Sequence, residues 1–194
     1  MSKEINKRFN DTMTEITEQI KKVSELVDKV IILDLINLIL NIHKNDNRIF
    51  VYGAGRSGFI GRCFAQRLMH LGINSCFISD AVTPQYTEKD LLIIISGSGE
   101  TTSSIAIALK SNKIRGKLAL FTANPNSIIG KISNITIEIK GKSKDVAMSE
   151  KSLAPYTSLF DISTLSVLDS ICGTLMFQLG VTEDDIDKRH ATLE

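Results

Sequence analysis

Hydroxyl side chains and glycines alternate over residues 96–102, where the chain reads SGSGETT and carries four hydroxyls and two glycines. Glycines let the backbone turn tightly and expose its N–H groups, and hydroxyls add further donors. A helix is expected from Ser103, and its N-terminus adds a partial positive charge. The alternative is a turn whose hydroxyls only cap the helix, but this stretch holds more donors than a cap needs. The sequence therefore predicts a pocket for a dianion such as phosphate.

A second glycine loop, GAGRSG at residues 53–58, follows an expected strand and matches the dinucleotide pattern G-x-G-x-x-G. In a dinucleotide-binding protein, Asp80 after the next strand would bind a ribose hydroxyl. However, Arg56 and Ser57 inside the loop suggest polar contacts to a small ligand, and a dinucleotide does not need a second anion loop. A small phosphorylated molecule between the two loops is favoured, and NAD binding stays as an alternative.

The elements that position these loops are strands that alternate with helices, which indicates a parallel sheet with right-handed crossovers. The unbroken apolar run Leu91–Ile95 is typical of a strand buried on both faces. We expect an α/β fold of the flavodoxin-like type, with five parallel strands in the order 2-1-3-4-5, so that the loops after strands one and three meet. The expected strands are 48–53, 74–79, 91–95, 117–122 and 135–139, and the expected core helices are 59–71, 103–112 and 159–179.

Apolar residues recur every three or four positions over residues 2–28 and cover most of residues 31–43, which predicts an N-terminal helical hairpin. Such a hairpin covers the core or packs against another subunit, so a homo-oligomer, dimer or tetramer, is expected. We expect one domain over residues 1–194, with residues 1–45 as a helical extension and residues 46–194 as the α/β core and C-terminal helices.

The composition excludes several classes of protein. The chain has 194 residues, a net charge of +1 and 6% aromatic residues, which argues against a nucleic-acid partner. Its most apolar segment, Val30–Ile42, is interrupted by Asp34 and is too short to span a membrane. No apolar leader follows Met1, and the three widely spaced cysteines are expected to be buried, reduced thiols without metal-ligand spacing. These features predict a cytoplasmic protein without a membrane or metal partner.

Several stretches together resemble a known family. GAGRSG, SGSGET and the distance between them are similar to the SIS (sugar isomerase) domain of phosphosugar isomerases and phosphosugar-binding regulators. The stretches Gly53–Gly72 and Leu91–Thr101, the loop at Thr83 and the ending KRHATLE resemble the 6-phospho-3-hexuloisomerases most. The resemblance implies an isomerase that interconverts 3-hexulose 6-phosphate and fructose 6-phosphate through a 2,3-enediol, without a metal or redox cofactor. It also implies formaldehyde assimilation by the ribulose monophosphate pathway, or pentose-phosphate supply.

The resemblance also implies roles for individual residues. Asp161 matches an acid–base carboxylate at the start of the long C-terminal helix, and His190 matches a C-terminal histidine that a neighbouring subunit can supply. The serine loop should hold the phosphate, and Arg56 and Ser57 should face the sugar or the phosphate. The implied substrate-binding set is Gly55, Arg56, Ser57, Asp80, Thr83, Ser96, Gly97, Ser98, Glu100 and Thr101.

The chain departs from the family pattern at the residues closest to the chemistry. Hexuloisomerases usually carry Glu at the positions of Asp161 and Asp80, and Met-Gly at the positions of Tyr156 and Thr157. A shorter carboxylate shifts its reach by about 1.5 Å. A protein that binds a phosphosugar without turnover, or an isomerase of a different sugar phosphate, therefore stays open. Residues 141–150 are expected to form a solvated connector, or alternatively a loop beside the site.

Overall fold

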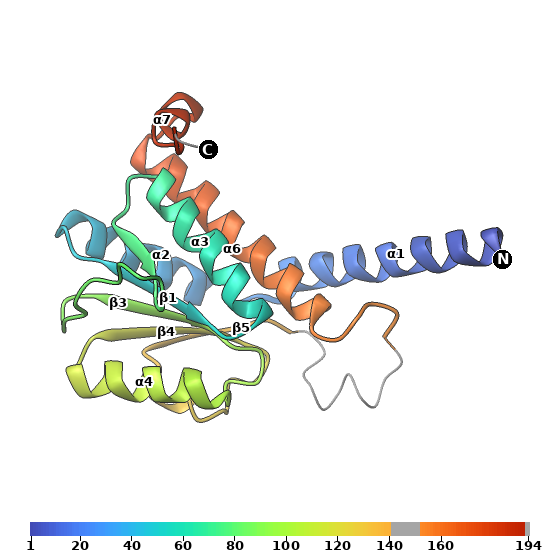
Figure 1. The fold of residues 1–194 in the computed structure, drawn as a ribbon, viewed down its shortest axis with the longest axis horizontal. Helices are drawn as coiled ribbons and strands as arrows, with labels where there is room; N and C mark the ends of the chain where they lie inside the picture. The colour runs from blue at the N-terminus through green and yellow to red at the C-terminus, as the bar shows by residue number, and fades with distance from the viewer. Residues whose placement is uncertain (141–151, 193–194) are drawn as a thin grey trace.

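The computed structural model describes residues 1–140 and 152–192, and the expectations for residues 141–150 lie outside this part of the chain. Figure 1 shows a central sheet with helices on both faces and one long helix that extends away from the body. The expected alternation of strands and helices is present along the core.

The predicted sheet is confirmed, with five parallel strands in the order β2-β1-β3-β4-β5. In the centre, β1 pairs with β3 from Ile49↔Leu91 to Gly53↔Ile95, so both strands end at the same level. Their following loops therefore meet at one edge of the sheet, as expected. The strands are β1 (Ile49–Gly53), β2 (Ser75–Phe77), β3 (Leu91–Ile95), β4 (Lys117–Thr122) and β5 (Ile135–Glu138).

Two apolar cores lie on the two faces of the sheet, because successive strand side chains point in opposite directions. Every residue of β3 is buried, which is the reason for its unbroken Leu/Ile run. Ile93 and Ile95 belong to the larger core, whereas Leu92 and Ile94 belong to the smaller one. The larger core is covered by α3 (Arg56–His70), α6 (Ser158–Leu179) and the N-terminal helices, and the smaller one by α4 (Thr102–Ile114) and the short 3₁₀ helix η1 (Gly130–Ile132).

The two N-terminal helices are present as α1 (Ser2–Leu26) and α2 (Lys29–Lys44), but they open out instead of packing along each other. The cause is local: Val27 is extended and Asp28 caps α2 immediately, so the chain continues without reversing. As a result, α1 packs along α6, and α2 packs against β5 and α6.

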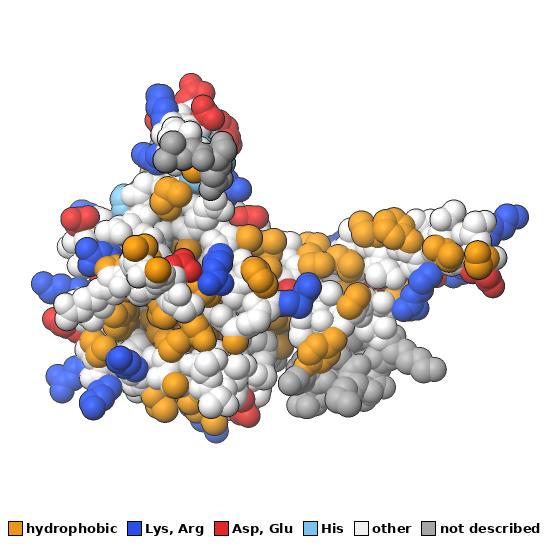
Figure 2. All heavy atoms as spheres, in the orientation of Figure 1, with side chains coloured by type: hydrophobic (Ala, Val, Ile, Leu, Met, Phe, Trp, Pro, Cys, Tyr) orange, Lys and Arg blue, Asp and Glu red, His pale blue; other side chains and the backbone are white. Residues whose placement is uncertain are grey.

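The first half of α1 carries large apolar side chains that stay about half exposed or more in the described chain. Ile5 is 61% exposed, Phe9 65% and Met13 47%, whereas Val23 near the other end of the helix is buried. Figure 2 shows hydrophobic side chains along the extended part of α1. We call Ile5, Phe9 and Met13 the α1 stripe.

The long helix α6 has the length and mean hydropathy, 1.4 over its most apolar window, of a segment that could cross a membrane. Half of that window is buried inside the fold, against α3, α1 and α2. This burial is what a core helix of a globular protein requires.

After α6, the chain turns at Gly180 into α7 (Glu183–Lys188), which a Thr182–Asp185 capping box begins. Only one of the three cysteines is buried as expected, and Cys76 is half-buried. Cys172 is buried and burial raises the pKa of its thiol to about 12, but Cys63 is exposed on α3.

Candidate active site

A pocket of about 310 Å³ opens at the carboxyl ends of β1, β3 and β4, where the crossovers leave in opposite directions. The N-termini of three helices meet there, since Arg56 begins α3, Thr101 precedes α4 and Thr157 precedes α6. Each helix start presents unpaired N–H groups and a partial positive charge. The lining residues are Ala54, Arg56, Ser57, Ile95, Ser96, Gly97, Ser98, Thr101, Ala123, Tyr156, Thr157 and Phe160.

The charge of this pocket suits an anion. Among the described lining residues there is one arginine and no carboxylate. A concave surface with convergent helix N-termini, hydroxyl donors and a guanidinium is a ready site for phosphate.

The serine loop folds as the sequence suggests. Ser96 accepts a hydrogen bond from the N–H of Gly99 (3.2 Å), and Ser98 accepts one from the N–H of Glu100 (3.2 Å). Because these hydroxyl oxygens act as acceptors, their hydrogens remain available for a ligand. Gly99 has φ +65°, and a Cβ at this position would clash with the Ser127 side chain, so the turn requires glycine.

The loop at residues 53–58 is shorter than expected, because α3 begins at Arg56 and not near Phe59. Gly55 takes φ +57° and forms the N-cap, and its carbonyl accepts from the N–H of Gly58 (3.0 Å). Arg56 and Ser57 therefore belong to the first turn of α3, where the positive end of the helix faces the pocket.

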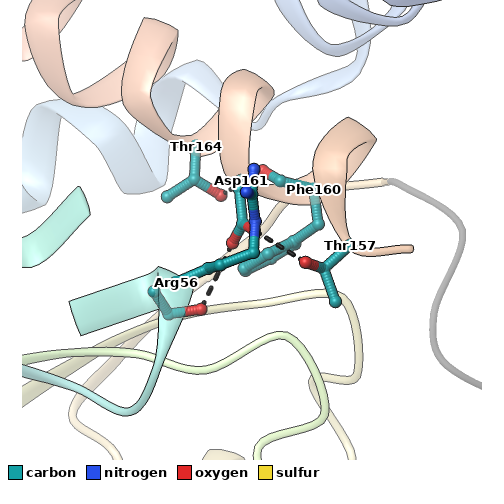
Figure 3. A network of polar contacts seen from close by, with 6 residues as sticks. Arg56, Thr157, Phe160, Asp161 and Thr164 are labelled. Carbon is teal, nitrogen blue, oxygen red and sulfur yellow. Dashed lines mark hydrogen bonds and ion pairs between the residues drawn. The ribbon is translucent and has the colours of Figure 1, made fainter. Parts of the chain in front are cut away.

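Asp161 lies behind the pocket and not in its wall. Its side chain is 1% exposed, and one of its oxygens, Oδ2, accepts hydrogen bonds from Nε of Arg56 (3.0 Å) and from Oγ1 of Thr157 (2.8 Å). The other oxygen, Oδ1, is 3.3 Å from Oγ of Ser57. Figure 3 shows Arg56 and Thr157 both directed at this carboxylate, from α3 and from the start of α6.

Six of the predicted site residues line the pocket together: Arg56, Ser57, Ser96, Gly97, Ser98 and Thr101. Gly55 sits between two lining residues and shapes the turn. Glu100 is exposed and lies between Ser98 and Thr101, but it is not part of the wall.

Asp80 and Thr83 are exposed in the loop after β2 and do not line the pocket. The carboxylate of Asp80 is 3.3 Å from Nη2 of Arg62, and Thr83 donates its hydroxyl hydrogen to the carbonyl of Asp80 (2.8 Å). Within one chain, these two residues are therefore engaged with the outer surface of α3 and with their own loop.

His190 follows α7 and lies at the other end of α3 from the pocket. Its ring stacks on that of His70, with 4.7 Å between centroids, and Arg189 donates to the carbonyl of His70 (3.0 Å). Burial and the neighbouring His190 lower the pKa of His70, in that order of importance. Since α3 has 15 residues, its two ends are about 21 Å apart.

The sequence interpretation missed several wall residues, and Tyr156, Thr157 and Phe160 are the most informative. The first two had been singled out only as departures from a family pattern. Phe160 packs over Gly97, where a Cβ would be 3.4 Å from the ring. The rule that ligands lie at strand carboxyl ends would have found Ala123, which follows β4 directly. Nothing local in the sequence brings the start of α6 to the serine loop.

Within residues 1–140 and 152–192, no group of three or more His, Cys, Asp or Glu side chains could hold a metal ion. The chemistry available at the described wall is anion binding and hydrogen-bond donation.

Comparison with known proteins gives consistent results. Residues 42–166 match the SIS domain. The chain is 40% identical over 151 residues to the 3-hexulose-6-phosphate isomerase of Bacillus subtilis, covering 77% of this chain and 82% of that protein. It is 34% identical over 172 residues to the protein of the same name from Methanocaldococcus jannaschii, covering 89% and 84%.

A solved structure is similar over nearly the whole chain. It is a hypothetical protein from Methanococcus jannaschii whose crystal structure was taken to infer a molecular function of 3-hexulose-6-phosphate isomerase. The TM-score is 0.79 at 34% identity, with 95% of this chain and 98% of that chain covered.

Proposed function

The chain belongs to the SIS domain family, and we propose that within this family it interconverts 3-hexulose 6-phosphate and fructose 6-phosphate. The observation that carries the proposal is the pocket in which three helix N-termini, the serine loop and Arg56 converge. Relatives that are 40% and 34% identical bear the name 3-hexulose-6-phosphate isomerase, which supports this substrate.

The serine loop anchors the phosphate in this proposal. Ser96, Ser98 and Thr101 donate hydroxyl hydrogens, and the first turn of α4 adds backbone N–H groups. Fixing the phosphate at one end of the six-carbon chain places the reacting carbons toward α3 and the start of α6. Arg56 and Ser57 then lie on the side of the sugar oxygens.

The reaction moves a carbonyl between C3 and C2, and it is redox-neutral overall. A base removes the proton from one carbon, the 2,3-enediol forms, and the proton returns to the neighbouring carbon. Donors at the wall stabilise the negative charge that develops on the carbonyl oxygen. One imidazole can carry the proton in both steps.

We assign that imidazole to His190 of a second copy of the chain. Within one chain, His190 is separated from the pocket by the length of α3, about 21 Å. The α1 stripe supports a homo-oligomer, because a row of exposed large apolar side chains on an extended helix favours association. Supply of His190 across such an interface would complete each pocket.

The test is incubation of the purified protein with fructose 6-phosphate in deuterated water. The proposal expects deuterium at C3 of the recovered fructose 6-phosphate and formation of 3-hexulose 6-phosphate. Saturable binding of fructose 6-phosphate with neither exchange nor product would instead identify a phosphosugar-binding protein without turnover. Exchange with another sugar phosphate alone would identify a different isomerase.

A further inference from the structure

The carboxylate at the start of α6 is separated from the pocket by other side chains. Asp161 is absent from the wall, its side chain is 1% exposed, and both of its oxygens have partners. A base must lie within hydrogen-bond reach of the proton that it removes. The groups between Asp161 and the pocket, Arg56, Ser57 and Thr157, are wall residues themselves.

Arg56 is the side chain that connects this carboxylate to the pocket. The guanidinium uses Nε for Asp161, and its side chain is 62% exposed. No hydrogen bond or ion pair of its two Nη groups is present within the described residues, so both can reach a ligand. A carboxylate that holds one edge of a guanidinium fixes the direction of the opposite edge, because the group is planar.

Thr157 holds Asp161 from the other side in a backbone conformation that costs stability. It has φ +66°, a left-handed conformation that β-branched residues rarely adopt. Although it occupies the N-cap of α6, its side chain caps no N–H of the helix and instead donates to Asp161. Strained residues that persist at a pocket are a frequent mark of function.

We propose that Asp161 is a positioning residue that aims Arg56 at the ligand, and that Thr157 locks Asp161 in place. Arg56 contacts the sugar phosphate, whereas Asp161 and Thr157 act through it. This inference rests on the proposed function for the identity of the ligand. It assigns the proton transfer to another group than Asp161.

The first experiment compares Asp161→Asn, Arg56→Gln and the double variant. Each single variant should weaken fructose 6-phosphate binding, measured by calorimetry, by about 10-fold or more, because an Å-scale displacement of a positioning group has large effects. The affinity of the double variant for fructose 6-phosphate should lie within about 3-fold of that of the weaker-binding single variant, since both changes remove one coupled unit. At saturating substrate, Asp161→Asn should still exchange solvent deuterium.

Two results would overturn the inference. One is loss of deuterium exchange in Asp161→Asn with unchanged affinity, which would identify Asp161 as the base. The other is a loss of affinity in the double variant that equals the product of the two single fold-losses. This result would mean that Arg56 and Asp161 act independently.

Thr157 offers a milder test that does not remove the buried charge. Thr157→Val keeps the shape and the branched Cβ but lacks the hydroxyl, and it should raise the KM by about 3- to 10-fold, the range expected when one hydrogen bond is lost. Thr157→Ser restores the hydroxyl and should recover most of that loss. Thr164→Val is the control, because Thr164 is a buried threonine of α6 whose hydroxyl donates to the carbonyl of Phe160 instead. An equal effect of Thr164→Val would contradict the inference.

The binding measurements separate this inference from the proposed function. If the wild-type chain binds fructose 6-phosphate but does not isomerise it, the proposed function fails, and the affinities of the variants still decide the role of Asp161. If the chain isomerises the substrate and Asp161→Asn abolishes exchange without weakening binding, only the inference fails.

Discussion

The two ends of α3 contact different groups of residues. At the N-terminal end, Arg56 and Ser57 face the pocket and are held from behind by Asp161. At the C-terminal end, the carbonyl of His70 accepts from Arg189, and the ring of His190 stacks on that of His70. Both arrangements follow the helix dipole, because the anion Asp161 lies at the positive end and the cation Arg189 at the negative end.

This comparison shows why the two residues expected to be catalytic are not equivalent. Asp161 and His190 both contact α3, but at opposite ends of a helix about 21 Å long. Asp161 reaches the pocket only through the wall residues that it binds, Arg56, Ser57 and Thr157, whereas His190 lies outside the pocket of its own chain altogether. In our proposal, a complete site therefore combines the N-terminal end of one α3 with residues carried at the C-terminal end of another.

The largest effect is expected from His190→Ala. If His190 moves the proton in a second copy, kcat should fall on the order of 10²- to 10⁴-fold while the affinity for fructose 6-phosphate stays within about 3-fold. Steady-state kinetics and calorimetry measure the two quantities, and His43→Ala is the control histidine. Weaker binding at unchanged kcat would place His190 among the binding groups instead.

Mixing two impaired variants, assayed at a fructose 6-phosphate concentration too low to saturate Arg56→Gln, tests whether the two ends of α3 serve different copies. Arg56→Gln damages the pocket end and His190→Ala damages the other end, so a mixed dimer keeps one intact site. After subunit exchange at equal amounts, about a quarter of the wild-type rate should return, since half of the dimers are mixed and each has one working site. Mass spectrometry under native conditions verifies the exchange. No recovery in verified mixed dimers would mean that the site is completed within one chain.

A glycine substitution should affect the pocket end alone. Gly99→Ala forces a side chain into a left-handed turn against Ser127 and should weaken binding of inorganic phosphate by about 10-fold or more. The control is Gly173→Ala on α6, where an added Cβ meets no atom within 4 Å. That variant should bind phosphate normally and be more stable by about 0.5–1 kcal/mol, because alanine favours a helix. Equal phosphate affinity in both variants would exclude the serine loop as the anchor.

The smallest effect is expected on stability, from the pH dependence of His70 at the C-terminal end of α3. Folding lowers the pKa of His70 from 6.5, so the unfolded chain takes up a proton that the folded chain resists. The stability that the neutral ring confers is complete above pH 6.5 and decreases as the pH falls through the window below it, by at most about 1.4 kcal/mol per pH unit. The midpoint of thermal unfolding should fall by roughly a few °C in this window. The decrease should be smaller in His70→Asn and unchanged in His43→Asn.

The sequence predicted what depends on neighbours along the chain. The unbroken run Leu91–Ile95, the strand order and the serine loop all follow from local patterns, and the structure has each of them. The pattern also predicted correctly that Arg56 and Ser57 lie at the pocket, since the loop at residues 53–58 and the serine loop both follow central strands. The start of α3 was misplaced, because Gly55 completes the turn three residues earlier than expected, and β2 (Ser75–Phe77) is shorter than the expected strand at 74–79.

The parts that were not predicted depend on contacts between distant segments. Asp161 and Arg56 are 105 positions apart, and neither type of residue by itself indicates an ion pair behind a wall. The left-handed conformation of Thr157 is unpredictable from its own identity, because a β-branched residue disfavours it. The stacking of His190 on His70 depends on how α7 docks on α3.

The segment that leads into α6 also binds the N-terminal helix. Glu15 on α1 accepts hydrogen bonds from the N–H groups of Leu153 and Ala154 (2.8 Å each) and from the hydroxyl of Ser152 (3.0 Å). These partners lie 137 to 139 positions away along the chain.

Contacts between such distant positions form slowly, because closing a long loop costs entropy before the contact compensates for it. During synthesis, α1 is made well before these partners and cannot fulfil this role until residues 152–154 have followed. We therefore expect the serine loop, built from neighbouring residues, to be in place before Thr157 reaches Asp161. The phosphate anchor would then be an early product of folding, and the alignment of Arg56 one of its last steps.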